Sequence, residues 1–399
     1  MKPAGTIPHW FDARRMQQIC HAAPATPCFV YDFNVVHDKV VALRAAMPAG
    51  IAIHYAMKAN PLPALVRAIV PLVDGIDIAS GGELPIALAA EAGHVSFAGP
   101  GKRDSELEAA ITAGITINLE SAGEAGRALA IADRLGIVPR LAVRVNPDFA
   151  LKGSGMKMGG GAAAFGVDAE RAADLVRAIR AAGADWRGFH IFAGSQALDS
   201  DALAATQAAT IALAARLSAD VGAAPPLVNL GGGFGIPYFG GERPVDIASI
   251  GSRLGAALEQ RPDALADSRF ALELGRWLVG EAGVYLTTIV DRKESRSETF
   301  LVTDGGLHHQ LAASGNFGTV VRRNYPIAVA RRIGDVATEI VNVVGCLCTP
   351  LDKLGDRVAL PRADVGDVIA VFMAGAYGAT ASPSAFLGHG PANEVLINA

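Results

Sequence analysis

The feature that most constrains the fold is a strand–helix alternation that repeats eight times between residues 51 and 276. Short apolar or β-branched runs alternate with alanine-rich stretches whose apolar residues recur three and four positions apart, the spacing of an amphipathic helix. The strand-like runs are IAIHYAMK (51–58), GIDIAS (75–80), HVSFAG (94–99), ITINLE (115–120), RLAVRVN (140–146), RGFHIFAG (187–194), LVNLGG (227–232) and FALELGR (270–276). Eight such units predict a closed parallel (β/α)8 TIM barrel. A doubly wound open sheet is the alternative that periodicity leaves open.

The pattern changes after about residue 283. The stretches GVYLTTIVDRKESRSETFLVTDGG, GDVATEIVNVVGC and VGDVIAVFMAG are typical of strands and turns, and alanine-rich helices become scarce. We therefore predict an α/β chain with a barrel at 36–282 and a mostly β, sandwich-like domain formed by 1–35 together with 283–399. The length of 399 residues, too great for one ordinary domain, supports this division.

Composition excludes several functional classes. Hydrophobic residues make up 51% and charged residues 19%, with a net charge of −4, so a large core can form and no basic excess indicates nucleic acid. No apolar run approaches the roughly 20 uninterrupted residues that span a bilayer. The N-terminal residues lack the apolar segment of a secretory signal. We expect a soluble cytoplasmic enzyme that binds neither nucleic acid nor membrane.

The cysteines and histidines predict no metal site. Four cysteines are too few for a disulfide scaffold, and no Cys/His set has zinc-ligand spacing. His54 and the pair His308-His309 are expected to be core or solvated histidines. Cys346 and Cys348, in CLCTPLD, are either small core residues or, if partly exposed, potential proton donors.

Polar residues follow several predicted strands at the end where barrel active sites are built. Lys58 is the last residue of IAIHYAMK, where partial desolvation would lower its pKa and favour Schiff-base chemistry. A simpler interpretation is an ordinary lysine at the barrel rim whose amine extends into solvent. Gly231–Gly233 could cradle a phosphate or form a tight turn. Glu273 could keep a pyridine nitrogen protonated or simply pair with Arg276.

Four further polar residues have similar alternatives. Asp77 and Arg144 lie at or near strand ends, and Ser195 could offer its hydroxyl to a phosphate. Tyr377, in a glycine- and alanine-rich turn, could reach the same phosphate. Polar structure at the barrel rim, or packing of an aromatic ring, would explain each of them equally simply.

The order of these motifs is more specific than any one of them. The series HYAMKAN, GIDIASGGEL, VRVNP, HIFAGSQ, NLGGGFG, ELGR, CLCTPLD and GAYGATASPSAF resembles the fold-type III decarboxylases that depend on pyridoxal 5′-phosphate (PLP). This family includes the diaminopimelate, ornithine and arginine decarboxylases. The resemblance covers nearly the whole chain. It implies a lyase with a PLP-binding barrel of the alanine racemase type, a β-sandwich domain, and a head-to-tail homodimer with shared active sites.

The resemblance also implies a role for individual residues. Lys58 would form the Schiff base, Glu273 would face the pyridine nitrogen, and Cys348 would reach the neighbouring subunit's site to reprotonate Cα. Further cofactor-binding roles would fall to Asp77, Arg144, Phe192, Ser195, Gly231, Gly232, Gly233, Gly275, Arg276 and Tyr377. Substrate-binding roles would fall to Arg276, Arg322, Arg323, Tyr325, Asp352 and Tyr377. Either Arg322 or Arg323 could bind a substrate carboxylate, or the two could be a solvated pair.

Two departures from the family pattern bear on the substrate. Phe192 stands where the family commonly has a histidine stacked on the PLP ring, and phenylalanine can stack but cannot carry charge. Thr349 follows Cys348, where diaminopimelate decarboxylases have a glutamate that binds the distal amino group. These departures argue against diaminopimelate as the substrate.

One branch of the family is most similar in four segments of this sequence, which are FHIFAGSQ, DGGLHHQLAASGNFGTVVRRNYP, LCTPLD and GAYGATASPSAFLGH. That branch includes exosortase-associated decarboxylases and decarboxylases of glutamyl groups tethered to acyl carrier proteins. We expect the substrate to be an amino acid or a carrier-bound aminoacyl group. The alternatives are a decarboxylase of free diaminopimelate, ornithine or lysine, an amino-acid racemase, and a PLP-binding homeostasis protein without turnover.

Overall fold

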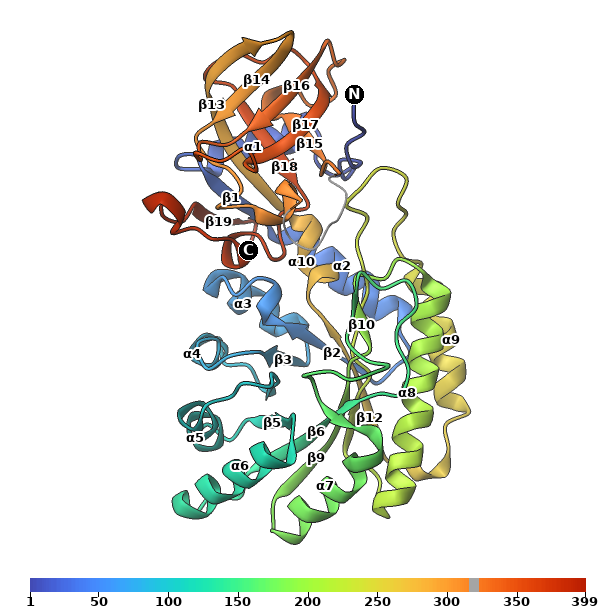
Figure 1. The fold of residues 1–399 in the computed structure, drawn as a ribbon. Coiled ribbons are helices and arrows are strands. Elements are labelled where there is room, and N and C mark those ends of the chain that lie inside the picture. The colour runs from blue at the N-terminus through green and yellow to red at the C-terminus, as the bar shows by residue number, and fades with distance from the viewer. Residues whose placement is uncertain (316–322) are drawn as a thin grey trace. The chain divides into compact units, whose positions relative to one another are not determined.

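The computed structural model describes residues 1–315 and 323–399 (Figure 1). The chain forms two compact units. The β unit comprises Met1–His37, Ile236–Arg243 and Arg276–Ala399, and the barrel unit comprises Asp38–Gly235 and Pro244–Gly275. The short segment Ile236–Arg243 therefore groups with the β unit, although the sequence-based division placed it within the barrel.

Eight parallel strands close the barrel unit into a ring. Their order is β5-β4-β3-β2-β12-β11-β9-β6, and β5 also pairs with β6. The strands are β2 (Ile51–Ala56), β3 (Gly75–Ile78), β4 (Val95–Phe97), β5 (Thr116–Leu119), β6 (Arg140–Asn146), β9 (Asp185–Ile191), β11 (Leu227–Asn229) and β12 (Arg269–Leu274). The ring confirms the predicted (β/α)8 barrel and excludes the open sheet.

Helices formed by the alanine-rich stretches surround this ring (Figure 1). They are α2 (Phe33–Ala46), α3 (Pro63–Ile69), α4 (Leu84–Ala89), α5 (Asp104–Thr112), α6 (Ala122–Leu135), α7 (Ala169–Ala181), α8 (Ser200–Val221) and α9 (Ile247–Glu259). Helix α6 shows why such stretches begin and end where they do. Ser121 accepts a hydrogen bond from the backbone N–H of Glu124, and Gly136 ends the helix with a left-handed φ of 66°.

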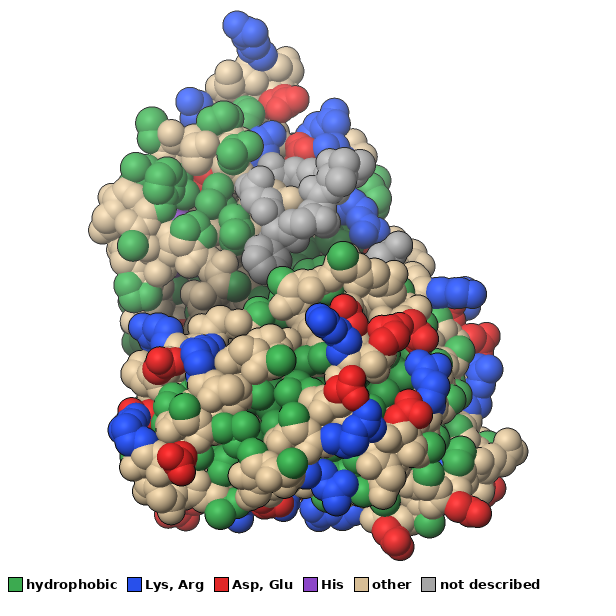
Figure 2. Space-filling view, turned by 60° about the horizontal axis from the view of Figure 1, so that its bottom comes forward, with side chains coloured by type: hydrophobic (Ala, Val, Ile, Leu, Met, Phe, Trp, Pro, Cys, Tyr) green, Lys and Arg blue, Asp and Glu red, His purple; other side chains and the backbone are tan. Residues whose placement is uncertain are grey.

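The outer surface of the barrel unit carries charges of both signs. Acidic and basic side chains are interspersed on the face shown in Figure 2, and some form ion pairs between neighbouring helices. One such pair joins Arg127 and Asp104 at 2.6 Å, and another joins Arg134 and Glu108 at 2.8 Å. Exposed pairs of this kind contribute little stability, but they interleave the two signs over the helices.

Helix α8 is long and apolar enough to cross a membrane, and among the described residues no other helix meets both criteria. Of its relevant window, 56% is buried, and the helix packs against α7 and α9. Because buried core helices satisfy the same criteria, α8 is weak evidence for a membrane span.

The β unit is mostly β, as predicted. Its eight-stranded sheet has the path β15-β18-β13-β14-β16-β17, and β1 pairs with both β13 and β19. The strands are β1 (Cys28–Asp32), β13 (Gly283–Ser295), β14 (Glu298–Thr303), β15 (Ile327–Val329), β16 (Glu339–Val344), β17 (Lys353–Leu360), β18 (Val368–Phe372) and β19 (Asn393–Ile397). Helices α1 (Ala13–Ala22) and α10 (Arg276–Val279) accompany the sheet. The N-terminal strand β1 therefore belongs to this sheet.

Candidate active site

Lys58 lies at the carboxyl end of the barrel strands, in a 3-10 turn, η1 (Met57–Ala59), that directly follows β2. The predicted strand reached the lysine, whereas β2 ends at Ala56, because the chain turns there. The Nζ atom of Lys58 is 3.8 Å from Oε1 of Glu273 and 5.5 Å from the ring centre of Phe192. An amine, a carboxylate and an aromatic ring therefore meet at this rim, and the lysine side chain is 41% exposed.

The turn that carries Lys58 is held on both sides. The Tyr55 hydroxyl donates a hydrogen bond of 2.8 Å to the carbonyl oxygen of Asn60. On the other side, a Cβ added at Gly275 would lie 2.8 Å from the Cβ of Ala59. Glycine at this position therefore lets the end of β12 pack closely against the lysine turn.

Glu273, in β12, is buried and hydrogen-bonded to a histidine. Its Oε2 atom lies 2.8 Å from Nε2 of His190, in β9. Burial and the charge of Asp77 would raise the pKa of Glu273, but the hydrogen bond and charge of His190, together with Lys58, outweigh them and lower this pKa. Glu273 is therefore ionised at neutral pH. Sequence reasoning missed His190, although it lies in a predicted strand two residues before Phe192.

Asp77 lies inside the ring, in β3, within a polar network. Its Oδ1 atom is 3.3 Å from Nδ1 of His54 and accepts a hydrogen bond from the Ser96 hydroxyl. Burial alone would raise the pKa of Asp77, but His54 and Ser96 outweigh burial and lower it to about 2. Burial would lower the pKa of His54, but Asp77 outweighs this and raises it. His54 is thus a core histidine, one of the two alternatives that the sequence left open, and its partner is a predicted cofactor residue.

Arg144, in β6, is paired inside the barrel unit. Its Nη1 atom donates a hydrogen bond of 2.7 Å to Oε1 of Glu120, and its guanidinium carbon is 5.0 Å from the ring centre of Phe165. Glu120 also accepts from the backbone N–H groups of Gly99 and Gly166. The sequence missed Glu120 as a partner, although it ends the strand-like run ITINLE.

The glycine turn after β11 is required by close backbone packing. Gly231 and Gly233 have positive φ values of 68° and 83°. A Cβ at Gly232 would lie 1.9 Å from the carbonyl oxygen of Glu273, and one at Gly233 would lie 2.7 Å from that of Gly194. Ser195 is half-buried beside this turn, in the two-residue strand β10 (Gly194–Ser195). The turn therefore joins Glu273 and Ser195 at one end of the ring.

A half-buried arginine, Arg276, lies in the β unit. The Nη1 atom of Arg276 donates a 2.8 Å hydrogen bond to the hydroxyl of Tyr238, and its guanidinium carbon is 4.7 Å from the ring centre of Tyr377. Tyr325 packs on Tyr238 with ring centres 4.7 Å apart. The buried Nε atom of Arg276 has no hydrogen-bond partner in the described part of the chain. A guanidinium whose buried N–H is unused fits an anion such as a phosphate. Sequence reasoning missed Tyr238.

Besides Arg276, two more arginines are predicted to bind substrate, Arg322 and Arg323. Arg322 lies outside the described residues. Arg323 pairs with Glu242 at 3.0 Å, and its guanidinium carbon is 3.8 Å from the ring centre of Phe239. Its charge is therefore already balanced within the β unit.

Asp352 is buried and braces the segment that carries Cys348. Its Oδ1 atom accepts a 2.7 Å hydrogen bond from the backbone N–H of Leu307, and Oδ2 accepts one of 2.8 Å from that of Leu347. Cys348 is exposed on the same segment, and Cys346 is half-buried. The structure thus gives Asp352 a bracing role, whereas the resemblance implied substrate binding.

Replacing Asp352 with asparagine is expected to lower the free energy of unfolding by about 1–3 kcal/mol, because an amide group would face a buried backbone N–H and leave it without an acceptor. Thermal and urea unfolding of the purified protein measure this loss. The matched control is Asp335→Asn, at an exposed position of the same unit, which should change stability by less than about 0.5 kcal/mol. Equal effects of the two substitutions would contradict the bracing role.

Comparison with known proteins gives a consistent result. Residues 34–280 match the family model described as the pyridoxal binding domain of pyridoxal-dependent decarboxylases. An L-glutamyl-[BtrI acyl-carrier protein] decarboxylase from Niallia circulans is 35% identical over 379 residues, which cover 93% of this chain and 88% of that protein. A diaminopimelate decarboxylase from Methanothermobacter thermautotrophicus is 31% identical, with 88% of this chain and 82% of that protein covered. The crystal structure of Helicobacter pylori diaminopimelate decarboxylase complexed with L-lysine is similar with a TM-score of 0.84 and 26% identity, covering 96% of this chain and 94% of that one.

Proposed function

This chain belongs to the pyridoxal-dependent decarboxylase family, and we propose that it removes CO2 from an aminoacyl group tethered to a carrier protein. Membership makes it a PLP-dependent carboxy-lyase, and its named relatives are decarboxylases rather than racemases or cofactor carriers. The substrate proposal rests on one observation. The relative named for an L-glutamyl group on an acyl carrier protein is similar over 93% of this chain.

The described residues fit PLP. When bound, PLP supplies an electron sink for the pair of electrons that departing CO2 leaves behind. We propose that the Lys58 amine attaches the cofactor covalently and that the ionised Glu273 keeps a proton at the pyridine nitrogen. The orphaned Nε of Arg276 and the glycine turn are the features that suit a phosphate. The remaining proposed cofactor residues are Asp77, Arg144, Phe192, Ser195, Gly275 and Tyr377.

We further propose that the active unit is a homodimer in the cytoplasm. In this dimer the exposed thiol of Cys348 would donate a proton from Sγ to Cα in the neighbouring subunit's site. A donor that serves another subunit has to be exposed on its own chain, as Cys348 is. All four cysteines are free thiols, which is typical of proteins in a reducing compartment.

The residues proposed for the far end of the substrate favour an uncharged group. Thr349 follows Cys348 and offers no carboxylate to a distal amine. Arg323 is already neutralised by Glu242 at 3.0 Å, so it has less need of a substrate carboxylate. A thioester to a carrier arm has no charge and needs no ionic partner, whereas a buried ammonium or carboxylate would need one. These features support a tethered substrate over a free diamino or acidic amino acid.

A CO2-release assay on the PLP-loaded enzyme tests the substrate proposal. We expect kcat/KM for an L-glutamyl group carried as a thioester on a carrier protein to exceed that for free L-glutamate, diaminopimelate, lysine or ornithine by at least about 100-fold. A glutamyl thioester on the pantetheine arm alone separates recognition of the thioester from recognition of the carrier. Faster turnover of free diaminopimelate would overturn the proposal and favour the second candidate, to which the 31% identical relative points. Inversion of the substrate without CO2 would indicate a racemase.

A further inference from the structure

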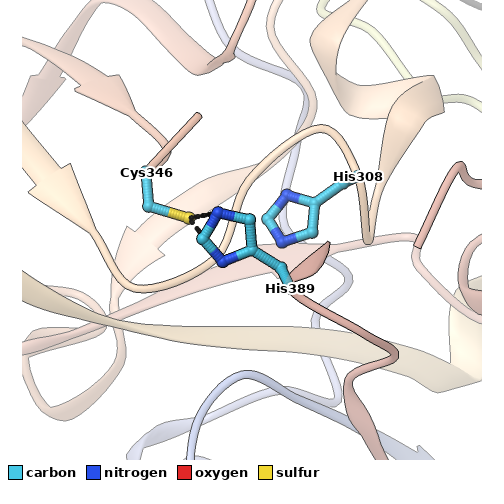
Figure 3. A group of neighbouring side chains, drawn as sticks. All are labelled: His308, Cys346 and His389. Atoms are coloured by element: carbon cyan, nitrogen blue, oxygen red, sulfur yellow. Dashed lines mark hydrogen bonds between the residues drawn. The ribbon is translucent and has the colours of Figure 1, made fainter. Parts of the chain in front are cut away.

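A second cluster of reactive side chains lies in the β unit. His308, Cys346 and His389 come from three separate segments and face one another (Figure 3). One potential ligand atom from each lies within 4.8 Å of the other two. The Sγ atom of Cys346 is 3.9 Å from each ring nitrogen of His389, and the rings of His308 and His389 have centres 4.9 Å apart. None of the three has a role in the proposed decarboxylation.

His308 is the most informative member of this cluster. Its side chain is 0% exposed, yet neither ring nitrogen has a hydrogen-bond partner in the described structure. A neutral imidazole has one ring nitrogen with a free lone pair, and this is the form that binds metals. Buried polar groups usually have a bonding partner, so we expect a ligand at the ring nitrogens of His308.

We propose that His308, Cys346 and His389 bind one divalent cation of borderline softness, of which Zn²⁺ is the best fit. One thiolate and two imidazoles are preferred zinc ligands, and three protein ligands leave a fourth tetrahedral position for water. On binding, Cys346 loses its thiol proton to solvent, an S–Zn bond forms, and the displaced waters leave the ion. The exposed side of the cluster, at His389, is where the remaining water fits.

The ligand atoms have to move closer to hold the ion. Tetrahedral zinc places nitrogen and sulfur ligands about 3.4–3.6 Å from one another, less than the 4.8 Å limit seen here. His389 can make this movement, because it is exposed and lies between Gly388 and Gly390, which have positive φ values of 78° and 80°. His309 holds the segment that carries His389, because its Nε2 donates a 3.0 Å hydrogen bond to the carbonyl oxygen of the next residue, Gly390.

The position of the site indicates what the ion would do. Cys346 lies two residues before Cys348 on the segment that Asp352 braces. A metal bond at Cys346 would fix this segment to His308 and His389, and so would order the backbone that carries Cys348.

Zinc titration of the full-length, PLP-loaded protein after treatment with a chelator tests this site. We expect one Zn²⁺ per chain by elemental analysis, an apparent Kd below about 1 µM by calorimetry, and a rise in melting temperature. Substitution of Co²⁺ should give the charge-transfer absorbance of a cobalt–thiolate bond. These readouts do not depend on decarboxylation, so they can fail while the proposed function holds.

Matched variants identify the ligands. Cys346→Ser and His389→Ala are each expected to weaken Zn²⁺ binding at least 100-fold and to remove the cobalt–thiolate band or shift it. Cys348→Ser, two residues away, and Cys20→Ser, in α1, should keep both. His389 is exposed, so its variant should fold even if a change at buried His308 did not. Retention of Zn²⁺ affinity in both Cys346→Ser and His389→Ala, or loss of the band only in Cys348→Ser, would overturn the assignment.

Discussion

Lys58→Ala is expected to abolish decarboxylation and to leave the protein without the absorbance of covalently held PLP. The substitution removes both the amine that attaches the cofactor and a group that can transfer protons, so kcat should fall by at least about 10⁴-fold. The fold should survive, because the side chain is 41% exposed and its contact with Glu273 is a long 3.8 Å. The absorbance spectrum and a CO2 assay of the purified variant measure both effects.

Two further variants separate the amine from its charge. Lys58→Arg keeps a cation beside Glu273 but cannot attach the cofactor through an amine, so it should be as inactive as Lys58→Ala. Lys293→Ala, at an exposed lysine in β13, should retain wild-type activity. Full activity in Lys58→Arg would show that charge alone is needed and would remove Lys58 from its proposed role.

The barrel was predictable because its signals are local. A strand of alternating or continuous apolar residues and a helix with 3.6-residue periodicity are each defined within a few neighbouring positions, and eight repeats leave few ways to pack. The exact end of a strand is less local. β2 ends at Ala56 and Lys58 lies in the next turn, because Tyr55 bonds to Asn60 across that turn, a contact that periodicity does not register.

The partners of the site residues depend on strand order and register, so the sequence could not supply them. His190 and Glu273 are 83 positions apart and meet because β9 and β12 flank β11. Glu120 meets Arg144 because β5 and β6 close the ring. The convergence of Cys346 with His389 depends in the same way on the folding of the β unit, and spacing along the chain predicted no metal site there.

Glu273→Gln is expected to lower kcat by about 10²–10³-fold while PLP stays attached to Lys58. The amide has nearly the shape of the carboxylate and can still meet His190, but it has no charge to keep a proton at the pyridine nitrogen. In the wild-type protein the pKa of Glu273 is lowered. The carboxylate is therefore fully charged at any pH above the usual pKa of glutamate, and it loses its charge only when the pH falls through the lowered pKa. Deprotonated Glu273 should therefore persist throughout the mildly acidic range, and protonation of Glu273 should cause no fall in the wild-type kcat there.

The pH profile of kcat and the spectrum of bound cofactor test this role together. Glu273→Gln should show the low kcat at every pH, with covalently bound PLP still visible in the spectrum. If Glu273 had only a structural role, its substitution would lower the PLP content and leave kcat per bound cofactor unchanged. Glu108→Gln, at the ion pair with Arg134 on the barrel surface, is the matched control and should match the wild type. A wild-type kcat in Glu273→Gln would mean that the charge held at 2.8 Å from His190 serves the barrel core and not the cofactor.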